Sequence, residues 1–352
     1  MLSHNIDCGA LEAMLFGLRN ALLEEDDYQT LCQCDSVADA QSFLCATDYG
    51  FFLQNDGALL EKGGTDNLQL SIVKEYAYFR SNATGALAKF LDFISESYQL
   101  DNILKIIAGQ RSHSSLEVLT KCHPLGELPV ISALTACASV PEILDIIAET
   151  SNLERYFTKE NDIDFDEMPI EYVRALVQKN WIEEFNLFCQ SLDGETAQVM
   201  EEILAAEADR NVITIILNSM GSCVEPEVNE EWRRRVFPRV GALIPVHEAL
   251  AKTRSFNDLL DCLHEFPDLY DMCRCKTERD GDRRGMVGSN SFENNARRKS
   301  VEVYRDAFTR QFHFGLYYAY IKLKAFEIDN IRWVIECINQ NMRDHIADFL
   351  FY

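Results

Sequence analysis

The residues best suited to chemistry lie in one short segment, Glu207-Ala208-Asp209-Arg210. Two carboxylates and a guanidinium this close together allow three interpretations: a network of ion pairs, a surface that docks a partner, or acid/base catalysis. The residue types favour ion pairing most and catalysis least. Glu207, Asp209 and Arg210 are also our candidates for contact with a partner. Because an apolar run follows, we expect the segment at the head of a helix.

Other candidate sites each lack a necessary member. His247-Glu248 starts like a zinc-protease motif, but the second histidine is missing one helical turn later. Three aspartates within residues 162–166 start like a calcium loop, but its turn glycine and bidentate glutamate are missing. No glycine-rich loop precedes a Lys-Ser or Lys-Thr pair, which argues against a nucleotide phosphate site. We therefore predict no catalytic residue, no metal and no cofactor.

The charge of the chain restricts its partners. With 33 basic and 57 acidic residues, the formal net charge is -24, which disfavours binding to nucleic acid or to an anionic lipid surface. No apolar run approaches the roughly 20 residues of a membrane span, and the N-terminal residues do not resemble a signal peptide. The 12 cysteines are scattered rather than arranged as a disulfide framework. These features predict a cytosolic chain with reduced thiols.

Apolar residues recur at helical spacing through most of the chain. Glycine and proline are scarce, at 16 and 8 residues, and no set of alternating strands is apparent. Broad apolar stripes such as these are buried between helices in bundles. We therefore predict an all-α protein. The clearest stripes are Leu11 to Leu22, Leu87 to Tyr98, Ile170 to Phe185 after Pro169, and Tyr304 to Tyr320.

A capping pattern occurs three times. Ser36, Ser139 and Ser255 are each followed three residues later by an acidic residue and then by an apolar run. In a capping box the hydroxyl and the carboxylate accept hydrogen bonds from backbone N–H groups at a helix start. Each serine therefore predicts the start of a helix.

A second marker follows each serine after roughly 65 to 75 residues, and it opens another apolar run. The repetition predicts three related helical units with boundaries at 1–115, 116–221 and 222–352. The three markers are Asp101-Asn102-Ile103, Asp209-Arg210-Asn211-Val212 and Asp329-Asn330-Ile331.

Three segments interrupt the helical pattern and are predicted as loops: Asn55 to Asn67, Ser222 to Glu231 and Arg274 to Lys299. The last, a basic loop near 274–299, holds eight Lys or Arg against four Asp or Glu, which reverses the overall sign. A solvated insertion is the simpler interpretation of this loop. Contact with an acidic partner or a phosphate surface is the alternative.

Many short strings, in order along nearly the whole chain, resemble one family. The family is that of subunit d of the eukaryotic vacuolar-type proton-translocating ATPase, with a more distant likeness to its counterpart in archaeal-type ATPases. Asn211 departs from it, because a second arginine is usual there, and Cys8 replaces a usual asparagine. The strings include Asn5-Ile6-Asp7-Cys8-Gly9, Thr47-Asp48-Tyr49-Gly50, Lys121-Cys122-His123-Pro124-Leu125-Gly126, Glu207-Ala208-Asp209-Arg210, Gln311-Phe312-His313-Phe314, Asn330-Ile331-Arg332-Trp333 and Glu336-Cys337-Ile338.

The resemblance implies a funnel of three pseudo-equivalent helical-bundle units around a pseudo-threefold axis. It also implies a non-catalytic part of the membrane sector that couples the central shaft to the proteolipid ring. The expected partners are the shaft subunits and the ring, with the large membrane subunit a as a further candidate, and no homo-oligomer. The expected location is the cytosolic face of acidic organelles such as vacuole, lysosome and endosome. The alternative is a cytosolic helical scaffold of the same fold with another partner.

Two cysteines lie in strings that match the family in the first and last units, Cys34 and Cys337. If the three units close around an axis, these two thiols approach each other. Buried free thiols are the simpler expectation, and a redox-sensitive bridge is the alternative.

Overall fold

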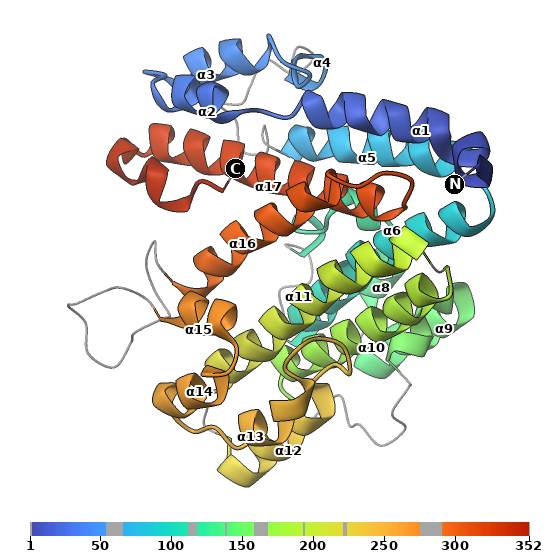
Figure 1. Cartoon of the computed structure of the whole chain (residues 1–352), viewed down its shortest axis with the longest axis vertical. Coiled ribbons are helices and arrows are strands. Elements are labelled where there is room, and N and C mark those ends of the chain that lie inside the picture. Colours follow the sequence, from blue (N-terminus) through green and yellow to red (C-terminus); the bar gives the residue numbers. More distant parts are fainter. Residues whose placement is uncertain are drawn as a thin grey trace. The chain divides into compact units, whose positions relative to one another are not determined.

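The structure, a computed structural model, describes residues 2–53, 66–111, 118–137, 139–157, 168–192, 194–220, 224–274 and 291–351 (Figure 1). Every regular element in these ranges is a helix, and none is a strand, which confirms the all-α prediction. Contacts between residues divide the chain into two compact units. Unit 1 combines Met1–Leu91 with Cys275–Tyr352, and unit 2 is Asp92–Arg274.

Unit 1 is built around α17 (Gly315–Asn339), a long helix near the C-terminus. Tyr317, Tyr318 and Tyr320 on this helix are fully buried. The ring of Tyr317 meets Phe79 of α5 edge-on at 5.3 Å, so the aromatic run fixes α17 against α5. The other elements of the unit are α1 (Leu2–Asn20), α2 (Glu25–Cys32), α3 (Val37–Leu44), α4 (Gly50–Leu53), α5 (Asp66–Asn82), the start of α6 (Gly85–Arg111), α16 (Phe292–Ala307) and η4 (Arg343–Phe349).

Unit 2 is built around the helices α10 (Ile170–Gln190) and α11 (Gly194–Ser219), which lie side by side in Figure 1. The ring of Phe93, from α6, stacks on Phe185 and Phe188 of α10 at 5.0 and 5.1 Å. The other elements are η1 (Pro124–Gly126), α8 (Ile131–Ala136), α9 (Val140–Thr150), η2 (Asn152–Tyr156), α12 (Pro226–Val236), η3 (Ile244–Val246), α13 (His247–Ala251), α14 (Phe256–Leu263) and α15 (Pro267–Cys273).

The three predicted helix starts are confirmed. Ser36, Ser139 and Ser255 are the N-cap residues of α3, α9 and α14. Each Oγ accepts a hydrogen bond from the backbone N–H of the acidic residue three positions later. At Ser255 the bonding is reciprocal, because Asp258 Oδ2 accepts the backbone N–H of Ser255 at 2.9 Å. The hydroxyls thus satisfy donors that have no partner inside the helix.

The second markers lie inside helices, and the prediction that the Glu207-Ala208-Asp209-Arg210 segment stands at the head of a helix was wrong. Asp101, Asp209 and Asp329 lie in the interiors of α6, α11 and α17. No glycine or proline precedes the markers closely, so the apolar pattern before each one continues through it. The Glu207-Asp209-Arg210 segment is therefore mid-helix, not at a helix head.

Each of the three predicted loops overlaps a helix at its C-terminal end. Asn55–Asn67 ends inside α5, Ser222–Glu231 ends inside α12, and Arg274–Lys299 ends inside α16. Proline in the first turn favours α12, and Ser291 caps α16. Residues 54–65, 221–223 and 275–290 lie outside the described residues, as do the three aspartates within 162–166.

The aromatic stripe from Tyr304 to Tyr320 belongs to two helices rather than one. The chain leaves α16 after Ala307, and Phe312 takes a φ of 64° before α17 begins. The division into two units is based on contacts between residues, and it does not test whether parts of the chain resemble one another. The three-unit boundaries and the funnel therefore stay predictions.

Candidate functional site

Asp209 is buried in the middle of α11 and holds a loop of unit 2. Its Oδ2 accepts the backbone N–H of Ala242 at 2.9 Å, and its Oδ1 accepts that of Leu243 at 3.0 Å. Burial raises the pKa of Asp209, and the two backbone donors partly oppose that rise. Both carboxylate oxygens therefore serve to position a backbone segment.

A similar arrangement occurs in α6 and in α17, where an asparagine takes the place of the aspartate. In α6, Asn102 Oδ1 accepts the N–H of His123 at 2.7 Å. Its Nδ2 donates to the carbonyls of His123 and Gly126 at 2.9 and 2.8 Å. In α17, the side chain of Asn330 accepts the N–H of Phe351 at 3.1 Å and donates to its carbonyl at 2.7 Å. We call Asn102, Asp209 and Asn330 the helix tethers.

Each helix tether is a residue of a marker of the sequence repeat, but its position within the marker differs in one of the three helices. The tether is the second marker residue in α6 and α17, whereas it is the first in α11. Each tether binds backbone that follows it by 21 to 34 residues. This recurrence supports the prediction of three related units.

Two tethered loops need glycine where they meet the helix. A Cβ on Gly126 would lie 2.4 Å from the backbone of Tyr98 and 2.7 Å from Asn102 Nδ2. A Cβ on Gly241 would lie 2.3 Å from Asp209 Oδ1, and Gly241 has a φ of 113°. Only glycine allows such a close approach in that backbone conformation.

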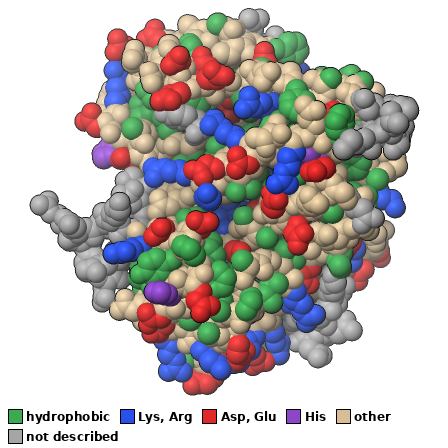
Figure 2. All heavy atoms as spheres, viewed as in Figure 1, with side chains coloured by type: hydrophobic (Ala, Val, Ile, Leu, Met, Phe, Trp, Pro, Cys, Tyr) green, Lys and Arg blue, Asp and Glu red, His purple; other side chains and the backbone are tan. Residues whose placement is uncertain are grey.

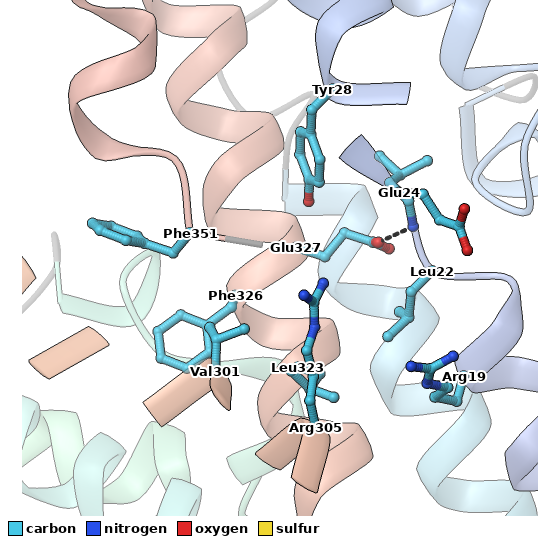
Figure 3. Close-up of a pocket in the computed structure, with 11 residues that line it drawn as sticks. Arg19, Leu22, Glu24, Tyr28, Val301, Arg305, Leu323, Phe326, Glu327 and Phe351 are labelled. Carbon is cyan, nitrogen blue, oxygen red and sulfur yellow. Dashed lines mark hydrogen bonds between the residues drawn. The ribbon is translucent and has the colours of Figure 1, made fainter. Parts of the chain in front are cut away.

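A buried ion pair lies one turn before the tether in α17. Lys324 Nζ lies 3.1 Å from Glu327 Oε1, and the two side chains are 3% and 4% exposed. Glu327 also accepts the hydroxyl of Tyr49 at 2.6 Å and the backbone N–H of Leu23, the latter drawn as a dashed line in Figure 3. Lys324 Nζ sits 4.1 Å from the centre of the Tyr49 ring. The pair thus anchors the chain before α2 and before α4 to α17.

A second carboxylate lies near this ion pair. Tyr320 donates its hydroxyl to Glu75 Oε2 of α5 at 2.7 Å. Burial raises the pKa of Glu75, and Lys324 and the hydroxyl of Tyr320 oppose that rise. One lysine therefore faces a buried carboxylate, Glu327, and a half-buried one, Glu75, and tyrosine hydroxyls donate a hydrogen bond to each.

Comparison with known proteins places these features in a family. The family model described as ATP synthase (C/AC39) subunit matches residues 11–349. The chain is 33% identical to a probable V-type proton ATPase subunit d of Oryza sativa subsp. japonica, over 100% of this chain and 98% of the relative. V-type proton ATPase subunit d1 of Arabidopsis thaliana is 32% identical over 100% of this chain and 98% of its own length. V-type proton ATPase subunit d of Saccharomyces cerevisiae is 30% identical over 98% of this chain and 97% of its own length.

The chain belongs to the ATP synthase (C/AC39) subunit family. This confirms the resemblance to subunit d of the vacuolar-type ATPase. Family members of this name are accessory rather than catalytic subunits. Among the described residues, no helix combines the length and apolar character of a membrane span.

The three residues that we predicted to contact a partner differ in how deeply they are buried. Glu207 is buried like Asp209, and Arg210 is half-buried beside them on α11. Asp209 has a structural task, but its partners are backbone N–H groups rather than a guanidinium, so the ion-pair interpretation of the segment stays a prediction. Contact of Glu207, Asp209 and Arg210 with a partner stays a prediction.

The sequence reasoning missed Lys324 and Glu327, and it did not assign a task to Asn102 or Asn330. A usable signal exists for the ion pair, because Lys324 and Glu327 lie three residues apart within an otherwise apolar stretch. Charged residues on the buried face of a helix are rarely unpaired. The partners of the asparagines have no such signal, since they are backbone groups.

Cys34 and Cys337 are both free thiols in this structure. Burial raises the pKa of each, and at Cys34 the carboxylates of Asp39 and Asp35 add to the effect. Cys32, at the end of α2, is close enough to both that each thiolate would raise its pKa. A bridge between Cys34 and Cys337 stays a prediction.

We predict that Gly241→Ala weakens the fold through Asp209. The added methyl strains a left-handed residue and displaces a buried carboxylate, so we expect a loss of about 3 kcal/mol in unfolding free energy. Gly194→Ala is the matched control, because Gly194 also has a positive φ, of 63°, but open space around it. Urea denaturation followed by circular dichroism measures both. Equal losses in the two variants would show that the tether is not the cause.

We predict strong coupling between Lys324 and Glu327. Glu327→Gln removes the paired counter-charge of a buried ammonium and leaves only the half-buried Glu75 near it, which should cost about 3 kcal/mol in unfolding free energy. Adding Lys324→Met should recover at least about 1 kcal/mol relative to the sum of the single losses. Glu293→Gln, in an exposed pair with Arg297, is the control and should cost under about 0.5 kcal/mol. Additive losses in the cycle would contradict the coupling.

The predicted bridge has a direct test on the folded chain. Because the raised pKa values leave few thiolates at neutral pH, we expect a Cys34–Cys337 link only under an added thiol oxidant. Alkylation followed by peptide mass spectrometry identifies the linked pair. Cys34→Ser and Cys337→Ser should both abolish the link, whereas Cys32→Ser should keep it. A link that instead requires Cys32 would refute the assignment.

Proposed function

We propose that this chain couples the central stalk of a V-type proton ATPase to its proteolipid ring, so that ATP hydrolysis drives proton translocation. The observation that carries the proposal is the similarity to V-type proton ATPase subunit d over nearly the full length of both chains. End-to-end similarity is more informative than a shared domain, because nearly the whole length of each relative takes part in the match.

The construction of the helices fits such a role. A protein that transmits torque must resist rotation of one helix against another, and close-packed interiors resist deformation. Apolar packing alone tolerates some sliding between helices. The helix tethers and the Lys324–Glu327 pair add directional bonds inside each unit, so loops keep their register on α6, α11 and α17.

The expected partners are the shaft subunits and the proteolipid ring, with the large membrane subunit a as a further candidate. The expected location is the cytosolic face of acidic organelles such as vacuole, lysosome and endosome. The net charge of -24 suits a chain that rests on a protein ring rather than on anionic lipid. Figure 2 shows acidic and basic side chains interspersed over one face, a surface suited to polar protein contacts.

The proposal is tested in organelle membranes. Depletion of the chain should abolish ATP-dependent acidification, and re-expression should restore it, because the ring would otherwise lose its connection to the shaft. Affinity purification from solubilised membranes should recover proteolipid and shaft subunits, whereas the purified chain should not hydrolyse ATP. Recovery of the chain without those subunits would instead support a cytosolic scaffold.

A further inference from the structure

Unit 1 contains a pocket of about 70 Å³ that the proposed function does not use. It is formed by the end of α1, the chain leading into α2, and the helices α16 and α17 (Figure 3). We call it the arginine pocket, because Arg19 and Arg305 contribute their guanidinium groups to its lining. Its apolar walls include Leu22, Val301, Leu323 and Phe326.

The walls of the arginine pocket are fixed by the buried bonds already described. Glu327 holds the backbone of Leu23 on one side. Asn330 holds the backbone of Phe351 on another, and it donates to the hydroxyl of Tyr28 at 3.2 Å. A pocket whose walls are preorganised loses less entropy when it binds a small group.

The two arginines are not consumed by ion pairs among the described residues. Arg305 is exposed at its helix surface, and Figure 3 shows its guanidinium directed into the pocket toward Glu327. Arg19 Nη1 donates to Asn20 Oδ1 at 3.2 Å, and its guanidinium lies 5.9 Å from the Phe308 ring centre. Neither of these Arg19 contacts is with a carboxylate.

The charge balance of the arginine pocket favours an anion. Its lining holds two arginines and two carboxylates, of Glu24 and Glu327. Glu327 is paired with Lys324, which also faces Glu75 outside the lining, so the lining itself presents two guanidinium groups against Glu24 and a paired Glu327. Two further guanidinium groups, of Arg297 and Arg298, lie 5.9 and 5.8 Å from the ring centre of Phe351, and that of Arg297 is paired with Glu293.

The net charge of -24 does not prevent this binding. Exposed charges further away than about 8 Å are largely screened at physiological salt, so the nearby arginines dominate the local field. Guanidinium groups match carboxylate and phosphate oxygens with paired N–H donors. We propose that the arginine pocket binds a single oxyanion, a carboxylate or a phosphate group, through Arg305 and Arg19.

Calorimetric titration of the intact chain at constant ionic strength tests the site with two probes. Inorganic phosphate represents a free anion, and a blocked tetraglutamate peptide represents an acidic segment of a partner. Arg305→Gln should weaken binding at least about tenfold, because hydrogen bonds to charged groups are the strong ones. Arg19→Gln should weaken it in the same direction.

Lys299→Gln is the matched control, since it removes one positive charge from the same helix outside the pocket lining. It should change affinity less than about twofold if screening operates as expected. Unchanged circular dichroism would confirm that each variant folds. Binding of phosphate alone identifies a free anion as the ligand, and binding of the peptide identifies an acidic segment. Binding of neither probe, or equal binding by the Arg305→Gln variant, overturns the proposal.

Discussion

Polar side chains buried inside long helices determine how the rest of the chain is held. In the interior of each of the helices α6, α11 and α17, one side-chain amide or carboxylate binds the backbone of a later segment of the chain. Burial of apolar side chains is stronger in total, but it has no direction and tolerates small shifts. A loop whose buried N–H loses its partner is destabilised by about 1–3 kcal/mol per group. That penalty selects one register for each loop.

In unit 1 this constraint joins the two chain segments that form the unit. Glu327 accepts the backbone N–H of Leu23, and Asn330 donates to the hydroxyl of Tyr28. Both side chains lie on α17, within one helical turn of each other. The ion pair with Lys324 costs desolvation, and a packed apolar pair is often as stable. Its value is therefore positional, because it directs a carboxylate at one backbone N–H and one hydroxyl.

The sequence allowed the helices to be predicted more fully than their connections. Local signals sufficed for α3, α9 and α14, since the serine and the acid that cap each helix lie three residues apart. The start of α10 beside Pro169 was equally local. By contrast, α12 was hidden because its charged residues resemble a loop until their ion pairs four residues apart are considered.

The tethers could be located but not interpreted from the sequence. Their markers recur visibly, yet each partner is a backbone group 21 to 34 residues away, and backbone groups leave no trace in residue types. For the segment with Asp209, the apolar run that follows therefore suggested the start of a helix. The glycines offer the missing clue in retrospect: Gly126 and Gly241 are the residues without a Cβ where a tether meets its loop.

The tethers also limit which residues remain for partners. Asp209 accepts two backbone N–H groups, so contact with another protein would have to compete with the loop that it holds. Side chains whose charge is not neutralised inside the fold have no such competition. Arg305 is of this kind, since it lies at the surface of α16 with its guanidinium in a preformed pocket. In a chain with so many acidic residues, specific recognition of an anion depends on such local exceptions rather than on the overall charge.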